Sequence, residues 1–180
     1  MKQLRLISFA TLLLFIFCFA QCNKNTSPPP DNPYGLPNAT QTGAGIFACR
    51  INGVNCIAKD DIFHQGGGIY NDSVLINGRF LIGDGPVGII VLGMQSNAKT
   101  NITYDFSDTV HTYGIYIGAT CPLNIVTPRF KPLSGNILFT KIDTARTYKI
   151  VSGIFNMKVF VDVCNDTLNI SDGRFDIGFN

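Results

Sequence analysis

The residues best suited to acid–base or metal chemistry in this 180-residue sequence are Asp60, Asp61 and His64. Two carboxylates beside an imidazole suit a hydrolase or a divalent-metal site, because these groups exchange protons and bind cations. Gly66-Gly67-Gly68 follows at once, which favours a solvated loop without chemistry. We therefore favour a non-catalytic protein and keep an extracytoplasmic hydrolase that uses this cluster as the alternative.

Other catalytic signatures are missing from the sequence, which contains no G-x-S-x-G, no H-E-x-x-H, no phosphate-binding loop and no calcium-loop spacing. All twelve acidic residues are Asp, so a glycosidase with paired glutamates is excluded. His111 lies in an alternating segment and is expected at the surface. Asp172 and Asp176 are explained by turn and edge-strand roles. The sequence predicts no cofactor.

Residues 1–21 have the features of a secretory signal peptide, with a cationic start at Met1–Arg5 and an apolar run at Leu6–Phe17. The run is too short to remain comfortably as a membrane-spanning helix. Phe19-Ala20-Gln21-Cys22 resembles the lipobox of bacterial lipoproteins, in which the cysteine is acylated and becomes the new N-terminus. The alternative is ordinary cleavage after Ala20, which releases a soluble product.

Residues 22–42 are rich in Asn, Pro, Ser and Thr and are expected to form a lipid-anchored tether. We expect residues 43–180 to form a single domain, held in the bacterial cell envelope, at the outer membrane, through acylated Cys22. The net charge of +2 comes from Lys2 and Arg5, because twelve Lys and Arg balance twelve Asp after residue 21. Without a cationic run, nucleic-acid binding is not expected.

Four cysteines remain in the expected domain, and an even number in an exported protein predicts two disulfides. If Asn52-Gly53 is a two-residue hairpin turn, Cys49 faces Cys56 at a separation that a disulfide can span. We favour Cys49–Cys56 with Cys121–Cys164 over Cys49–Cys164 with Cys56–Cys121. Zinc is the functional alternative, but C-x-x-C and a nearby histidine pair are both missing, so we predict no metal site.

From Gly45 onward, short apolar runs separated by glycine-rich turns predict an all-β domain, either an antiparallel sandwich or a partly open barrel, with a meander at its C-terminus. Alternation between residues 155 and 161 predicts a half-buried strand. The continuous apolar run Val87–Leu92 is expected in a central strand buried on both faces. Asp172-Gly173 is expected to form a hairpin turn between Leu168–Ser171 and Arg174–Phe179.

Two segments share a pattern, Asn77-Gly78-Arg79-Phe80 and Asp172-Gly173-Arg174-Phe175. We interpret both as one turn chemistry used twice, with Gly at the turn, Phe packed inward and Arg extending outward. Gly35–Gly43 with Phe47–Gly53, and the closing segments Thr140–Asp143, Val151–Phe155 and Ile170–Asp176, resemble a family of uncharacterised Gram-negative lipoproteins. This resemblance implies an exported, anchored β protein and assigns no catalytic residue.

Four sites resemble the Asp-Ser/Thr-apolar acceptor motif for O-glycosylation in some exported bacterial proteins, with acceptors at Ser73, Thr109, Thr144 and Thr167. Asp-Thr is also a good junction between turn and strand, so the motif has a structural explanation as well. The favoured function is a binding or structural module for an envelope protein or a glycan. Such a module should expose aromatic side chains, for which we consider Tyr70, Tyr113 and Tyr116.

Overall fold

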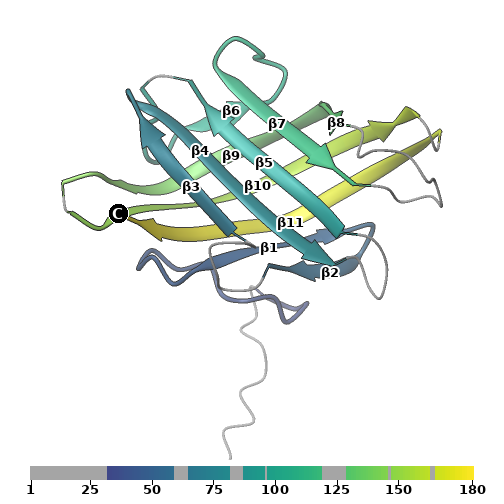
Figure 1. The fold of residues 1–180 in the computed structure, drawn as a ribbon. Coiled ribbons are helices and arrows are strands. Elements are labelled where there is room, and N and C mark those ends of the chain that lie inside the picture. The colour runs from purple at the N-terminus through teal and green to yellow at the C-terminus, as the bar shows by residue number, and fades with distance from the viewer. Residues whose placement is uncertain are drawn as a thin grey trace, which may run out of the picture. The chain divides into compact units, whose positions relative to one another are not determined.

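The computed structural model describes residues 32–58, 65–81, 87–95, 97–118, 129–145, 147–162 and 165–180. Within it, Leu36–Asn180 forms one compact unit, in which two antiparallel sheets face each other (Figure 1). The prediction of an all-β domain is confirmed, and of the two predicted architectures the sandwich is the one observed. None of the described residues forms a helix long and apolar enough to cross a membrane.

One sheet has six strands: β1 (Ile46–Ile51), β2 (Val54–Ile57), β6 (Thr103–Asp105), β9 (Pro132–Asp143), β10 (Lys149–Val161) and β11 (Asp166–Phe179). The other has five: β3 (Gln65–Tyr70), β4 (Ser73–Leu81), β5 (Val87–Met94), β7 (Thr112–Ile117) and β8 (Arg129–Phe130). Their spatial orders are β2-β1-β11-β10-β9-β6 and β3-β4-β5-β7-β8. Because β9, β10 and β11 are neighbours in both sequence and space, the C-terminal meander is confirmed.

The core lies between the sheets because inward and outward positions alternate along each strand. In β10, Phe155, Met157, Val159 and Val161 are buried and the residues between them are exposed, as predicted. Aromatic rings fill the centre of this core, with ring centroids 5.5 to 6.4 Å apart. They belong to Phe47, Phe139, Phe155 and Phe175.

The β1–β2 hairpin has the predicted two-residue turn. Asn52 and Gly53 both have positive φ, 48° and 85°, as this class of turn requires. Cys49 is therefore paired directly with Cys56 across the two strands.

The structure corrects the sequence predictions for a turn in β11 and for the burial of β5. Asp172-Gly173 makes no hairpin turn, because β11 runs without a break from Asp166 to Phe179 and contains a bulge at that point. Val87–Leu92 does lie in a central strand, but Ile89 and Val91 are partly exposed on the outer face while Ile90 and Leu92 are fully buried.

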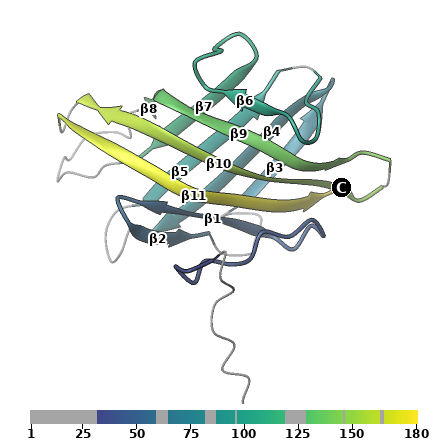
Figure 2. The same ribbon diagram turned by 180° about the vertical axis from the view of Figure 1, so that it is seen from behind.

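The compact unit begins at Leu36, not at residue 43 as the sequence suggested. Residues 36–42, assigned to the tether from composition, therefore belong to the domain. We call Leu36–Gly45 the strap; it runs beside β1 (Figure 2). Leu36 itself is buried.

Candidate functional site: a hollow beside the strap

The strap is fixed to the six-stranded sheet by one buried carboxylate. Asp176 follows the inward-facing Phe175 in β11 and therefore points to the outer face, yet it is 0% exposed. The backbone N–H groups of Thr42, Gly43 and Ala44 donate to it over 3.0, 2.9 and 3.0 Å. Gly43 has φ of 75°, and a positive φ lets successive N–H groups converge on one anion.

Hydroxyl groups complete the shell around this carboxylate. Thr40 Oγ1 donates over 2.5 Å and Ser152 Oγ over 2.6 Å, from the strap and from β10 respectively. Burial alone would raise the pKa of Asp176. The hydrogen bonds from Ser152, Thr40, Ala44 and Gly43 outweigh burial and lower this pKa to about 2. Asp176 is therefore a carboxylate at any physiological pH.

Side chains also donate hydrogen bonds to backbone carbonyls along the strap. Arg174 donates to the carbonyl of Pro37, and Lys141 donates to the carbonyl of Gln41. At the far end, Gln65 Nε2 on β3 donates to the carbonyl of Gly45 over 2.7 Å. The strap thereby bridges from the outer face of one sheet to the edge strand of the other.

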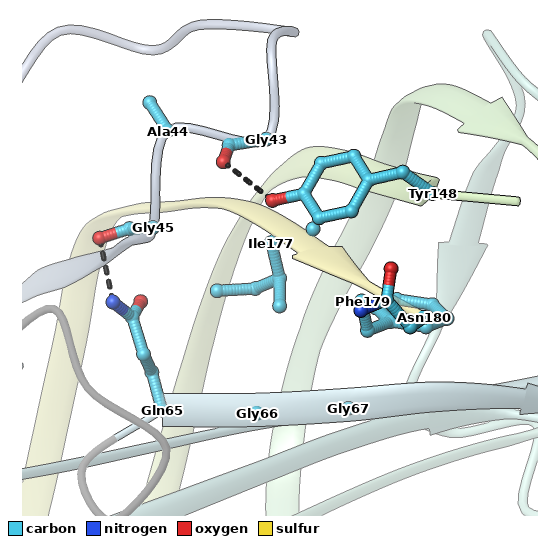
Figure 3. Close-up of a pocket in the computed structure, with 11 residues that line it drawn as sticks. Gly43, Ala44, Gly45, Gln65, Gly66, Gly67, Tyr148, Ile177, Phe179 and Asn180 are labelled. Carbon is cyan, nitrogen blue, oxygen red and sulfur yellow. Dashed lines mark hydrogen bonds between the residues drawn. The ribbon is translucent and has the colours of Figure 1, made fainter.

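A hollow of about 600 Å³ opens where the strap turns toward β3 (Figure 3). The Tyr148 hydroxyl donates to the Gly43 carbonyl and the Gln65 amide reaches the Gly45 carbonyl, so both side chains border the hollow. Ile177 lies between them. The lining consists of Gly43, Ala44, Gly45, Gln65, Gly66, Gly67, Tyr148, Ile177, Gly178, Phe179 and Asn180.

The chemistry of this lining is neutral, polar and aromatic. None of the eleven side chains is charged at neutral pH. The carboxamides of Gln65 and Asn180 contain both hydrogen-bond donors and acceptors, and the Gln65 Nε2 already donates to the Gly45 carbonyl. Tyr148 is 45% exposed and offers an aromatic ring. The hollow is therefore suited to an uncharged ligand with many hydroxyl or amide groups.

The acidic and histidine cluster predicted from the sequence, Asp60, Asp61 and His64, lies outside the described residues, as do Cys22, Cys121 and Cys164. His111 is exposed as expected, in the turn before β7. Its Nδ1 lies 3.0 Å from Asp108 Oδ2, and this hydrogen bond lowers the pKa of Asp108. In the part of the chain that the structure describes, no three His, Cys or Asp side chains are grouped to hold a metal ion.

Cys49 and Cys56 face the core as buried thiols, with no bond between the two sulfur atoms. Burial raises the pKa of both, and the charge of Cys56 raises that of Cys49 further. Tyr116 from the opposite sheet lies near them. Burial, followed by the charges of Cys56 and Cys49, raises the pKa of Tyr116 to about 12.

Tyr116 is 0% exposed, so the expectation that it contributes to an exposed aromatic cluster was wrong. Tyr70 is 68% exposed, and Tyr113 is partly exposed. Sequence reasoning did not identify the hollow, because the glycines and single aromatic residues that line it come from four distant segments.

The four proposed glycosylation acceptors all lie at or near strand ends. Thr109 is in the loop before β7, Thr144 follows β9 and Thr167 is the second residue of β11, and these three are exposed. Ser73, the first residue of β4, is partly exposed.

No family model, curated protein or solved structure matches this chain.

Proposed function

We propose that this chain is a non-catalytic, lipid-anchored protein of the bacterial cell envelope, akin to the lipoproteins that its two ends resemble, whose sandwich binds a neutral sugar in the hollow beside the strap. The observation that carries the proposal is the lining of that hollow. It combines an exposed Tyr148, two carboxamides and five glycines with no charged side chain. Binding sites of this kind are concave, partly apolar and supplied with a few fixed polar groups.

A neutral sugar fits this lining better than an ion does. A pyranose ring has one apolar face that can lie on an aromatic ring, and hydroxyl groups that both donate and accept hydrogen bonds. Asn180 supplies such a partner, and Gln65 borders the hollow while donating to Gly45. No side chain in the lining would offer a counter-charge to a charged ligand. A hollow of about 600 Å³ has room for more than one sugar ring.

The strap relates this site to the proposed anchor. Cys22 precedes Leu36 by 14 positions, and the segment between them contains Pro28-Pro29-Pro30, a composition that gives an extended spacer. The tether would hold the sandwich close to the membrane while leaving its surface accessible. Acylation of Cys22 and location at the outer membrane are both parts of this proposal.

Replacing Tyr148 by alanine is expected to abolish sugar binding. The measurement is saturation-transfer NMR of the full chain against glucose, galactose, mannose and N-acetylglucosamine and their short oligomers. Tyr148→Phe keeps the ring and should retain most binding, although it loses the hydrogen bond to Gly43. Tyr70→Ala is the matched control, because Tyr70 is exposed and does not line the hollow.

The same assay separates this proposal from the hydrolase. Asp61→Asn combined with His64→Gln should leave sugar binding unchanged, and the chain should not shorten the oligomers. If the wild-type chain cleaves an oligomer and the double variant does not, the protein is an enzyme and the proposal of a binding module is wrong. If the chain binds none of the sugars in the panel, the proposal that the hollow is a sugar site is wrong.

We further propose that Cys49 and Cys56 form a disulfide during export. Directly paired residues in adjacent antiparallel strands have Cα atoms about 4.5 to 5.5 Å apart, within the range that a disulfide spans. Both thiols are fully buried and have raised pKa values, so they react slowly once the sheets have packed. The bridge would therefore form earlier, by exchange with the disulfide of an exported oxidoreductase.

Tryptic mapping of the non-reduced protein is expected to link the peptide ending at Arg50 to the peptide Ile51–Lys59. Cleavage after Arg50 separates Cys49 from Cys56, so only a disulfide would hold the two peptides together. The intact mass should correspond to a chain that starts at Cys22 and carries acyl groups. It should rise by about 4 Da on reduction if two disulfides are present. Modification of Thr109, Thr144 or Thr167 would add the mass of a sugar at each site.

A peptide Ile51–Lys59 linked instead to Thr100–Arg129, which contains Cys121, would contradict the local pairing. An unmodified chain that starts at Gln21 would contradict acylation.

A further inference from the structure

The outer face of the five-stranded sheet is apolar. Outward positions on β5 and β7, together with Leu75 on β4, carry aliphatic side chains that are partly exposed, whereas their strand neighbours point into the core. The outward positions of β4 also include polar side chains, among them Asn77, which is paired with Val91. We call this set the apolar face: Leu75, Ile89, Val91, Ile115 and Ile117.

The strand register makes the apolar face continuous. Val91 is paired with Ile115, and the next row runs from Ile89 to Ile117. In Figure 1 the strands β3, β4, β5 and β7 lie at the front, with no other described element across them. An antiparallel sheet with one side in water normally alternates apolar and polar residues, so β5 and β7 depart from that rule, whereas β4 carries Asn77 and Arg79 on the same side.

Two arginines border the apolar face at one end. Arg79 on β4 is paired with Ile89, and Arg129 on β8 is paired with Ile117. Because Ile89 and Ile117 are themselves paired, the two arginines flank this row of isoleucines, one on each side. Both are exposed.

The other end of the face carries the tyrosines. A Cβ added at Gly93 would overlap the Tyr113 ring, and one added at Gly68 would overlap the Tyr70 ring. Each ring therefore lies flat on the sheet. None of the outward positions in the described part of β3, β4, β5, β7 and β8 carries an acid.

The outer face of the six-stranded sheet differs. It carries hydrogen-bonded Asn136 and Asn156, the ion pair of Arg50 with Asp172, and the strap. Ile154 and Phe160 are exposed on this face as well. The two faces of this sandwich therefore differ in their polar groups, since the six-stranded sheet carries an aspartate and paired asparagines on its outer face.

We propose that the apolar face docks on a phospholipid bilayer that contains anionic headgroups, an inference that adds to the proposed function and draws on its lipid anchor. Aliphatic side chains would enter the interface, tyrosines suit the headgroup level, and each arginine would be attracted to the negative surface. The tether keeps the domain near the bilayer, so even weak affinity of the face produces docking.

Charge decides between a bilayer and a second copy of the chain. Two copies packed face to face would bring four arginines into the contact with no acid from either face to pair with them. An anionic membrane surface supplies the missing negative charge.

The experiment uses the chain with Cys22→Ala, which has no acyl anchor, in co-sedimentation with vesicles of phosphatidylethanolamine and phosphatidylglycerol at 3:1. We expect binding that falls several-fold with phosphatidylcholine vesicles and with added salt. Arg79→Gln with Arg129→Gln should lower the partition coefficient about 20-fold. Val91→Thr with Ile115→Thr should lower it at least 5-fold while the thermal unfolding transition remains cooperative.

Matched controls lie on the other sheet. Ile154, 43% exposed, and Lys158 occupy outward positions of β10, so Ile154→Thr with Lys158→Gln should leave vesicle binding unchanged. If the Cys22→Ala chain does not sediment with anionic vesicles, the proposal is overturned. It is equally overturned if sedimentation equilibrium shows a dimer that Val91→Thr with Ile115→Thr dissociates, because the face then joins two copies.

The vesicle assay is independent of the sugar site. Tyr148→Ala should bind vesicles normally, and Arg79→Gln with Arg129→Gln should bind sugars normally. Failure of the sugar assay therefore leaves the membrane result standing, and the reverse also holds.

Discussion

Replacing Asp176 by asparagine is expected to lower the free energy of unfolding by about 3 to 5 kcal/mol, the cost typical of disrupting a buried, hydrogen-bonded charge. The carboxylate accepts hydrogen bonds from both the strap and β10 through its two oxygens. Asparagine keeps only one acceptor oxygen, so the donors that converge on the other lose their acceptor. An amide would also present hydrogen atoms to backbone N–H groups. The donors are Thr40, Thr42, Gly43, Ala44 and Ser152.

The effect should depend on pH in a defined direction. The pKa of Asp176 is lowered in the folded chain, to about 2 from an ordinary 3.8. Its contribution to stability is therefore complete above about pH 4 and is lost as pH falls toward 2. Urea unfolding of the wild type and of Asp176→Asn should differ most at pH 7 and converge near pH 2.

Release of the strap has its own measurement. Amide exchange at Thr42, Gly43 and Ala44 should become fast in Asp176→Asn, because their N–H groups lose the acceptor. Asp166→Asn is the matched control, since Asp166 is an exposed aspartate on the same strand. Unchanged protection of the three amides, with a stability within about 0.5 kcal/mol of the wild type, would show that the carboxylate does not hold the strap.

Local chemistry was sufficient to predict the β1–β2 hairpin. Asn and Gly tolerate the positive φ values that a two-residue turn needs, and no other part of the chain has to be known. The pairing of Cys49 with Cys56 follows directly from that turn.

The same reasoning failed at Asp172-Gly173, where context decides between a turn and a bulge. Asp172 has the positive φ of 54° that the motif favours. However, β11 is paired on both sides, with β1 and with β10, so the chain continues and the irregularity is absorbed as a register shift. A single sequence does not show whether a strand will have two neighbours.

The strap was missed for a different reason. Its contacts are hydrogen bonds from backbone and threonine donors to one distant aspartate, and such contacts leave no apolar periodicity in the sequence. Thr40 and Asp176 are 136 positions apart.

Introducing valine at Gly78 is expected to destabilise the sandwich by about 3 kcal/mol, at the upper end of what overpacking costs. Gly78 lies in the middle of β4, not at the turn expected from the Asn-Gly pair, and a Cβ there would overlap the ring of the fully buried Phe47 from the other sheet. Phe47 in turn packs against Phe155, with ring centroids 5.5 Å apart, so it has no free space to move into. Urea unfolding measures the change.

Gly66→Val is the control for that substitution, because a Cβ at Gly66 on the adjacent strand has its nearest neighbour at 3.6 Å and meets no backbone. It should change stability by less than about 1 kcal/mol. Phe47→Ala alone is expected to cost about 3 to 5 kcal/mol by leaving a cavity. In the double variant the new valine enters that cavity. The stability lost by the double variant should therefore be smaller than the sum of the two single losses by more than about 1 kcal/mol. Simple additivity would mean that Gly78 and Phe47 are not in contact, and the facing of β1 and β4 across the core would then be wrong.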